Sequence, residues 1–314
     1  MSHDDAAPAR ADRAILARAH DIRCVYGGGE KDFTAVDGVS LELGEGEILG
    51  LAGESGCGKT TLGNALAMIA TPPLYILSGT LEIDGESIDL STLSVADLKR
   101  HRPYRGRTVS MLPQGAMNSI SPTLRIRSLV HDVMRAHDPR VSRDEALDLA
   151  RDRLKMLEMP VRVLDSYAHQ LSGGMKQRMI TVISTLQNPR LLIADEPTSA
   201  LDVSSQRMLV EMLLAMVEQR IMSGVVFVTH DLPVLSQVSD RLAIMSGGRI
   251  VETGPTRRLV EQPEHDYTRT LLSSVLDPSR ETWERGRRRA GLDAGAAGPA
   301  APAAPAPEKE VGAR

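Results

Sequence analysis

Eight residues in the N-terminal third of the chain have the spacing of a phosphate-binding loop. Residues 53–60 read GESGCGKT and fit the pattern GxxxxGK[ST] in full. In such a loop the glycines let backbone N–H groups approach phosphate oxygens, the lysine reaches the β- and γ-phosphates, and the hydroxyl binds Mg²⁺. The sequence therefore predicts a nucleoside triphosphate and Mg²⁺ site, formed by Gly53, Ser55, Gly56, Cys57 (as a small filler), Gly58, Lys59 and Thr60, with Thr61 on the α-phosphate.

Two later apolar runs end in side chains that suit hydrolysis. Residues 191–194 (LLIA) are followed by Asp195 and Glu196, and residues 225–229 (VVFVT) are followed by His230. In open α/β sheets, ligands bind at the carboxyl ends of the parallel strands. We expect Asp195 to coordinate Mg²⁺, Glu196 to act as the general base on the attacking water, and His230, with Lys59, to stabilise the γ-phosphate.

Two further residues have weaker signals. Gln114 follows a short strand that breaks into a loop, and its amide could ligate Mg²⁺ or orient the water. Tyr26, upstream of the phosphate-binding loop, could stack on adenine, because bases stack readily on aromatic faces. Phe33 competes for that role, and Tyr26 is favoured.

A second turn of phosphate-binding type lies at residues 171–178, LSGGMKQR. Ser172, Gly173 and Gly174 at a helix start would offer a hydroxyl and free backbone N–H groups to an anion. The chain has one GxxxxGK[ST] loop for its own triphosphate. The second turn therefore predicts contact with a nucleotide that another subunit holds.

The pattern of apolar residues indicates the elements that position these groups. Short strands are expected between Ala14 and Leu43, interrupted at 27–29 and 37–38, and helical patterns dominate residues 94–170. Elsewhere strands alternate with helices: strands at 47–52, 79–90, 191–194 and 225–229, helices at 59–70, 143–159, 175–187 and 204–221, and a hairpin at 242–252. This order predicts the α/β class, with a P-loop NTPase core of mostly parallel sheet flanked by helices, an antiparallel β subdomain and an inserted α-helical subdomain.

Composition shifts divide the chain further. Residues 1–12 are expected to be disordered, and the main domain should cover 13–258, with its helical subdomain at about 94–175. Residues 259–280 follow, and the family resemblance given below implies that they are a C-terminal extension. From 281 to 314 the chain is rich first in arginine and then in alanine and proline, a composition that predicts a flexible tail.

Bulk composition excludes several classes of protein. The net charge of −4 gives no basic field for nucleic acid. No uncharged apolar run reaches about 18 residues, and the N-terminus lacks the pattern of a signal peptide, so we expect a cytosolic chain that reaches a membrane only through partners. The two cysteines, Cys24 and Cys57, have no metal-ligand spacing.

The order of these motifs resembles the ATP-binding-cassette (ABC) ATPases over roughly residues 14–255. The resemblance implies ATP-hydrolysing subunits that dimerise head to tail, with ATP between the P-loop of one subunit and the LSGG turn of the other. By motif match, Ser172 and Gly174 would contact the partner's ATP. Asp202, in Ser-Ala-Leu-Asp at 199–202, would lie between the two sites.

Three segments resemble the ATPases of oligopeptide, dipeptide and nickel importers: AVDGVS at 35–40, the GESG form of the P-loop, and HDYTRTLL at 265–272. That resemblance implies a second ATPase subunit, a copy or a paralogue, two integral-membrane permease subunits and an extracytoplasmic substrate-binding protein, with this chain peripheral on the cytoplasmic face of the membrane. Some members hold an iron–sulfur cluster through four cysteines in the extension. No cysteine follows Cys57 here, so no such cluster is expected.

The resemblance favours an oligopeptide or dipeptide as the cargo, with an oligosaccharide or nickel as the alternative. The peptide group commonly has Leu-Asn-Pro after the loop that contains the glutamine, here Gln114, whereas this chain has Ile120, Ser121 and Pro122. In that group this region normally faces the membrane subunit. A soluble complex, such as that of carbon–phosphorus lyase, is a further alternative.

Overall fold

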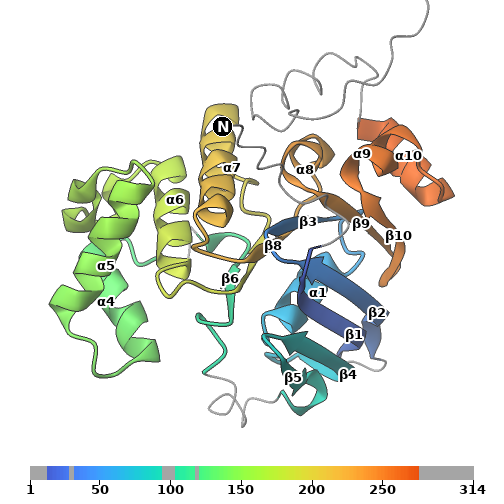
Figure 1. Cartoon of the computed structure of the whole chain (residues 1–314), viewed down its shortest axis with the longest axis horizontal. Coiled ribbons are helices and arrows are strands. Elements are labelled where there is room, and N and C mark those ends of the chain that lie inside the picture. Colours follow the sequence, from blue (N-terminus) through green and yellow to red (C-terminus); the bar gives the residue numbers. More distant parts are fainter. Residues whose placement is uncertain (1–12, 28–31, 94–102, 117–119, 276–314) are drawn as a thin grey trace, which may run out of the picture. The chain divides into compact units, whose positions relative to one another are not determined.

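A six-stranded sheet positions the motif residues (Figure 1). The computed structural model describes residues 13–27, 32–93, 103–116 and 120–275. The predictions for 1–12, 281–314 and the start of the helical subdomain lie outside these residues. In the sheet, β9 (Arg241–Ser246), β3 (Glu47–Ala52), β8 (Gly224–Val228), β7 (Leu191–Asp195) and β6 (Val109–Leu112) are parallel neighbours in that order. Only β10 (Arg249–Pro255) is antiparallel, paired to β9.

The central strands are buried on both faces, because their apolar side chains alternate between two hydrophobic clusters. On β8, Val225 and Phe227 belong to the cluster that includes α6, α7 and α8. Val226 and Val228 belong to the cluster on the opposite face, with α1 and the second sheet. A continuous apolar run is therefore required in these strands, which explains why the sequence pattern identified them.

A second, antiparallel sheet has the strand order β2-β1-β4-β5. Its strands are β1 (Ile15–Tyr26), β2 (Phe33–Gly44), β4 (Leu74–Ile83) and β5 (Glu86–Asp89). The expected break at residues 37–38 is wrong. Ile22 pairs with Val39 and Cys24 with Val36, so a bulge in β2 takes up one extra residue there and the strand continues.

Helices cover both faces of the six-stranded sheet. Helix α1 (Lys59–Leu66) contacts strands of both sheets, and Leu62, Ala65 and Leu66 are buried there. Helices α6 (Gly173–Ser184), α7 (Val203–Glu218) and α8 (Leu232–Val238) share the other hydrophobic cluster. The remaining elements are α4 (Ile126–His137), α5 (Arg143–Met156), α9 (Thr256–Glu261), α10 (Asp266–Val275) and the 3-10 turns η2 (Leu90–Thr92), η3 (Val161–Asp165) and η4 (Ala168–Gln170).

Several helix ends differ from the predicted ones. Helix α1 ends at Leu66 rather than near residue 70, because Met68 has a left-handed backbone (φ 57°). Helix α5 ends at Met156, shortly before Glu158, which is also left-handed (φ 53°). Helix α7 begins one residue earlier than expected, with Asp202 as its N-cap. The residue range expected for the helical subdomain also contains β6, which is part of the parallel sheet.

Candidate nucleotide-hydrolysis site

The phosphate-binding loop joins β3 to α1 and is packed closely against other backbone segments. Gly53 (φ 151°) and Gly58 (φ 107°) have positive backbone φ angles, which residues with a side chain rarely adopt. A Cβ on Gly53 would lie 2.2 Å from the Met245 carbonyl oxygen, and one on Gly58 would lie 2.2 Å from the Ala35 oxygen. Glycine is therefore required at both positions by the approach of neighbouring backbone as well as by the turn.

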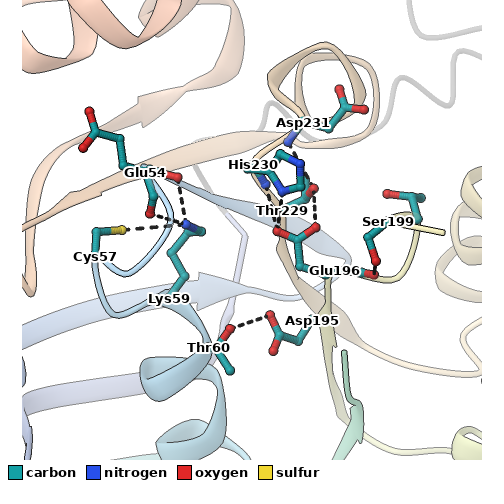
Figure 2. A network of polar contacts seen from close by, with 12 residues as sticks. Glu54, Cys57, Lys59, Thr60, Asp195, Glu196, Ser199, Thr229, His230 and Asp231 are labelled. Atoms are coloured by element: carbon teal, nitrogen blue, oxygen red, sulfur yellow. Dashed lines mark hydrogen bonds and ion pairs between the residues drawn. The ribbon is translucent and has the colours of Figure 1, made fainter. Parts of the chain in front are cut away.

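Lys59 is the first residue of α1, and its ammonium is turned back onto the loop (Figure 2). The Nζ atom donates to the carbonyl oxygens of Gly53 and Glu54, each at 2.7 Å, and lies 3.8 Å from Cys57 Sγ. Burial raises the pKa of the Cys57 thiol despite the nearby ammonium. Cys57 is thus a neutral, buried side chain. The Lys59 ammonium is hydrogen-bonded to two carbonyl oxygens, and phosphate oxygens could take their place.

Asp195, the last residue of β7, lies next to the loop's hydroxyl. Thr60 Oγ1 donates to Asp195 Oδ1 at 3.2 Å, and Asp195 is 1% exposed. Burial raises the pKa of Asp195 to about 6; the charge of Glu196 acts in the same direction, while the Thr60 hydrogen bond and the Lys59 charge oppose it. Asp195 Oδ2 is buried and has no hydrogen-bond partner among the described residues. An unpartnered carboxylate oxygen beside a hydroxyl fits the oxygen ligands that Mg²⁺ takes.

Glu196 and His230 are in direct contact (Figure 2). His230 Nδ1 lies 2.7 Å from Glu196 Oε1, and the His230 backbone N–H donates to the same oxygen at 3.2 Å. The other carboxylate oxygen, Oε2, accepts from Thr229 Oγ1 at 3.3 Å. Glu196 has a left-handed backbone (φ 48°), and its N–H donates to Val228 O at 2.8 Å, so β8 fixes the carboxylate at the end of β7.

These groups surround a cavity of about 310 Å³. Gln114 follows β6 and reaches the cavity, and both aromatic candidates line it as well. Tyr26 Oη is 3.1 Å from Thr61 Oγ1, whereas Phe33 is 62% exposed. The lining comprises Tyr26, Phe33, Ala35, Ser55, Gly56, Gly58, Lys59, Thr60, Thr61, Gln114, Glu196 and His230. Gly53, Cys57 and Asp195 are outside that set.

The LSGG turn forms the start of α6. Ser172 is the N-cap and accepts from the Met175 N–H at 3.3 Å. A Cβ on Gly174 would lie 2.6 Å from Ser205 Oγ, so α6 packs closely on the first turn of α7. Ser172, Gly173 and Gly174 are not among the described residues that line the cavity.

Asp202 has a local structural role at the start of α7. Its Oδ1 accepts from the Ser205 N–H at 2.9 Å and from the Ser204 hydroxyl at 2.5 Å, and its Oδ2 accepts from Ser205 Oγ at 2.8 Å. The hydroxyl and N–H donors hold the pKa of this carboxyl well below its usual range. The acidic residue before the helix was a capping signal that sequence reasoning missed.

Three other contacts at the site were also missed. Thr229 was read as the end of a strand, although its hydroxyl bonds Glu196. Gly248, in the β9–β10 turn, donates its N–H to Cys57 O at 3.1 Å. Tyr267 accepts from the Glu54 N–H at 3.0 Å. The last two join segments far apart in the sequence, so no local pattern could have found them.

Fold and site together define a P-loop nucleoside triphosphatase. The ABC transporter family model matches residues 36–199. The dipeptide transport ATP-binding protein DppD of Caldanaerobacter subterraneus subsp. tengcongensis is 36% identical, with 84% of this chain and 79% of that protein covered. The oligopeptide transport ATP-binding protein OppD of Bacillus subtilis is 36% identical over 80% of this chain and 68% of its own length. The chain belongs to the ABC transporter family, and it is an ATP-binding ATPase of that family.

Structural similarity confirms the predicted fold class. The dimeric post-hydrolysis structure of the ATP-binding cassette MJ0796, bound to ADP and Pi, has a TM-score of 0.64 and 26% identity, and covers 77% of this chain and 99% of that one. A second dimeric structure of MJ0796, described as a bacterial ABC transporter cassette, gives the same values. Among the helices that the structure describes, none has the length and apolar character that a membrane crossing needs.

Proposed function

We propose that this chain is the ATP-hydrolysing subunit of an importer and works as half of a head-to-tail ATPase dimer. One observation carries the proposal. A single cavity is lined by P-loop residues, Gln114, Glu196 and His230, while the LSGG turn is absent from its described lining. The turn, with its Ser172 hydroxyl and helix N-terminus, would complete the nucleotide site of a second subunit. The dimeric MJ0796 cassettes support a dimer of such subunits.

In the proposed site each residue has a separate task. Backbone N–H groups of residues 55–61 and the Lys59 ammonium would bind the phosphates, and Tyr26, or the more exposed Phe33, would contact adenine. Thr60, Asp195 and Gln114 would hold Mg²⁺, which supplies positive charge against the phosphate oxygens when bound. Glu196 would accept the proton of the attacking water, and His230 would stabilise the γ-phosphate. Catalysis of this kind depends mainly on positioning and electrostatics.

The proposed cargo is a dipeptide or oligopeptide. Relatives named for dipeptide and oligopeptide transport match over most of the chain, and the HDYTRTLL segment at 265–272 supports the same group. The glutathione import ATP-binding protein GsiA of Salmonella choleraesuis, 37% identical over 77% of this chain and 39% of its own length, is named for a small peptide as well. The proposed partners are a second ATPase, two permease subunits and, through them, a substrate-binding protein, with this chain peripheral on the cytoplasmic face of the membrane.

Purification from the native membrane tests the proposal. The tagged chain should copurify from detergent extracts with a polytopic membrane protein and a second ATPase subunit. The complex, reconstituted in vesicles with its binding protein, should accumulate labelled peptide only with ATP. Recovery solely in a soluble assembly would refute the transporter assignment and favour a complex of the carbon–phosphorus lyase type. Uptake of an oligosaccharide or nickel but not of peptide would refute the cargo alone.

A further inference from the structure

A helix near the end of the described chain is hydrogen-bonded to the phosphate-binding loop. The backbone N–H of Glu54, the second residue of the loop, donates to the hydroxyl of Tyr267 at 3.0 Å. Tyr267 lies in the first turn of α10, within the C-terminal extension. This extension therefore has direct contact with the backbone of the nucleotide site.

The start of α10 is itself fixed in place. Glu252 on β10 accepts two backbone N–H groups through its two oxygens, from Glu264 at 2.9 Å and from His265 at 3.1 Å. The Tyr267 N–H donates to His265 Nδ1 at 3.1 Å. Farther along the helix, Leu272 is buried in the main hydrophobic cluster. Tyr267 is thus held by a helix that is anchored through the two residues before it, which bond to β10, and through its buried Leu272.

Glu54 is also bonded through its carbonyl group. That oxygen accepts from Lys59 Nζ at 2.7 Å and from the Cys57 N–H at 3.3 Å. One residue therefore connects the Tyr267 hydroxyl, on its N–H side, to the P-loop lysine, on its carbonyl side. The position of Glu54 therefore places one of the two carbonyl oxygens that accept from the Lys59 ammonium.

The bond lies outside the space that a nucleotide would occupy. Neither Glu54 nor Tyr267 is among the described residues that line the cavity. Burial raises the pKa of the Tyr267 hydroxyl, so it stays neutral at physiological pH. ATP can therefore enter while the Glu54–Tyr267 bond remains intact.

We propose that Tyr267 is a positioning residue for ATP, which holds the loop backbone at Glu54 in the conformation that receives the phosphates. This inference rests on the proposed assignment of the cavity as the ATP site. A loop that is fixed before the ligand arrives loses less conformational freedom on binding, so it binds more tightly. The C-terminal extension would then set the ATP affinity of the site without contacting the nucleotide.

Tyr267→Phe removes the hydroxyl and keeps the ring. A neutral hydrogen bond of ordinary strength corresponds to about a three- to tenfold loss of affinity for ATP or for its non-hydrolysable analogue AMP-PNP. The KM for ATP should rise by a similar factor, whereas kcat at saturating ATP and the thermal midpoint of the nucleotide-free protein should change little. Tyr75→Phe, at a half-exposed tyrosine on β4, is the matched control and should leave all of these values unchanged.

A second variant tests the path of the effect. Glu252→Ala releases the Glu264 and His265 N–H groups and loosens the start of α10, so it should also weaken AMP-PNP binding. If both residues act through the same contact, the double variant should bind about as weakly as the weaker single variant, rather than with the product of the two effects.

Three results would overturn the inference: unchanged affinity in Tyr267→Phe, a fall in kcat and thermal midpoint with no change in KM, or independent effects in the double variant. Failure of the unaltered chain to bind AMP-PNP would instead refute the proposed ATP site.

Discussion

The imidazole of His230 lies 2.7 Å from the carboxylate of Glu196, and the two residues follow the ends of β8 and β7, which are neighbouring strands of the parallel sheet. The Thr229 hydroxyl donates to the second oxygen of the Glu196 carboxylate, so both of its oxygens accept hydrogen bonds from the segment that follows β8. Oε1 has two contacts with His230 and Oε2 has one with Thr229, so Oε2 keeps an acceptor site that a water molecule beside a γ-phosphate could use.

Replacing the proposed base should separate ATP binding from hydrolysis. Glu196→Gln keeps the size and the hydrogen-bonding positions of the side chain but removes its ability to take a proton. We expect ATP binding to persist and turnover to fall by about 10²- to 10⁴-fold. Phosphate release measures the rate, and size-exclusion chromatography with ATP should show an accumulated dimer. Hydrolysis at the normal rate would rule out Glu196 as the base.

A bulky cation in the LSGG turn should damage the neighbour's site. Ser172 lies outside the described lining of the cavity formed by its own chain, so Ser172→Arg should spare ATP binding there. In a dimer that contains one altered subunit, we expect hydrolysis to be lost at the P-loop of the unaltered partner. Nucleotide trapping, with one P-loop labelled at a time, distinguishes the two sites. Loss confined to the altered chain's own P-loop would contradict the head-to-tail arrangement.

The buried carboxylate of Asp195 should make the metal-free protein less stable as pH rises. Its pKa is about 6 in the folded chain against 3.8 when unperturbed, so between these values the folded state binds more protons than the unfolded state. Stability should therefore fall as pH rises from about 4 to about 6, by up to about 3 kcal/mol. Urea denaturation in EDTA, at intervals between pH 4 and 8, measures this slope.

Asp195→Asn should remove that slope, because the amide does not ionise. At pH 7.5 without Mg²⁺ the variant should be more stable than the unaltered chain, while its Mg²⁺-dependent ATPase activity should be lost. Asp148→Asn is the control, since that carboxylate is largely exposed on α5. If Asp195→Asn were less stable than the unaltered chain at every pH, ionisation of the buried carboxylate would not be what destabilises the folded state.

Arg153, on α5, should hold the carboxyl end of α6, the helix that begins at the LSGG turn, to the rest of the helical segment. Its buried guanidinium donates from Nη1 to Thr185 O at 2.8 Å and from Nη2 to Asn188 Oδ1 at 2.5 Å, at the carboxyl end of α6. Arg153→Met fills similar space but leaves these two acceptors without a donor. The free energy of unfolding should therefore fall by about 1–3 kcal/mol. Arg153→Lys keeps the charge but loses the two-pronged guanidinium, so its stability should lie between those of the unaltered chain and Arg153→Met. Equal urea midpoints for all three would contradict this role.

The positions of the polar residues after β7 and β8 could be predicted from the sequence, because the apolar run that forms each strand also marks where the strand ends. Asp195 and His230 each follow an uninterrupted apolar run, and β7 and β8 are buried on both faces. Such runs are identifiable without knowledge of the tertiary structure. The order of the strands in the sheet, in contrast, comes from the structure alone.

Contacts between distant segments could not be predicted in the same way. Tyr267 was recognised only as part of the HDYTRTLL segment, and its partner is a backbone N–H, which leaves no mark in the sequence. The closeness of Gly174 to Ser205 likewise depends on how α6 packs on α7. Predicted helix ends failed at Met68 and Glu158, where non-glycine residues adopt a left-handed backbone.

The position of β3 in the sheet has a consequence for synthesis. This strand carries the P-loop, yet both of its neighbours, β8 and β9, are made much later, from residue 224 onward. On a ribosome that adds roughly 5–20 residues per second, the apolar run at 47–52 waits about 10 s or longer for a partner. Tyr267 emerges later still. The nascent chain thus exposes the apolar strand β3 well before either of its neighbours exists, and the P-loop gains its place in the sheet only after residues beyond 224 have been made.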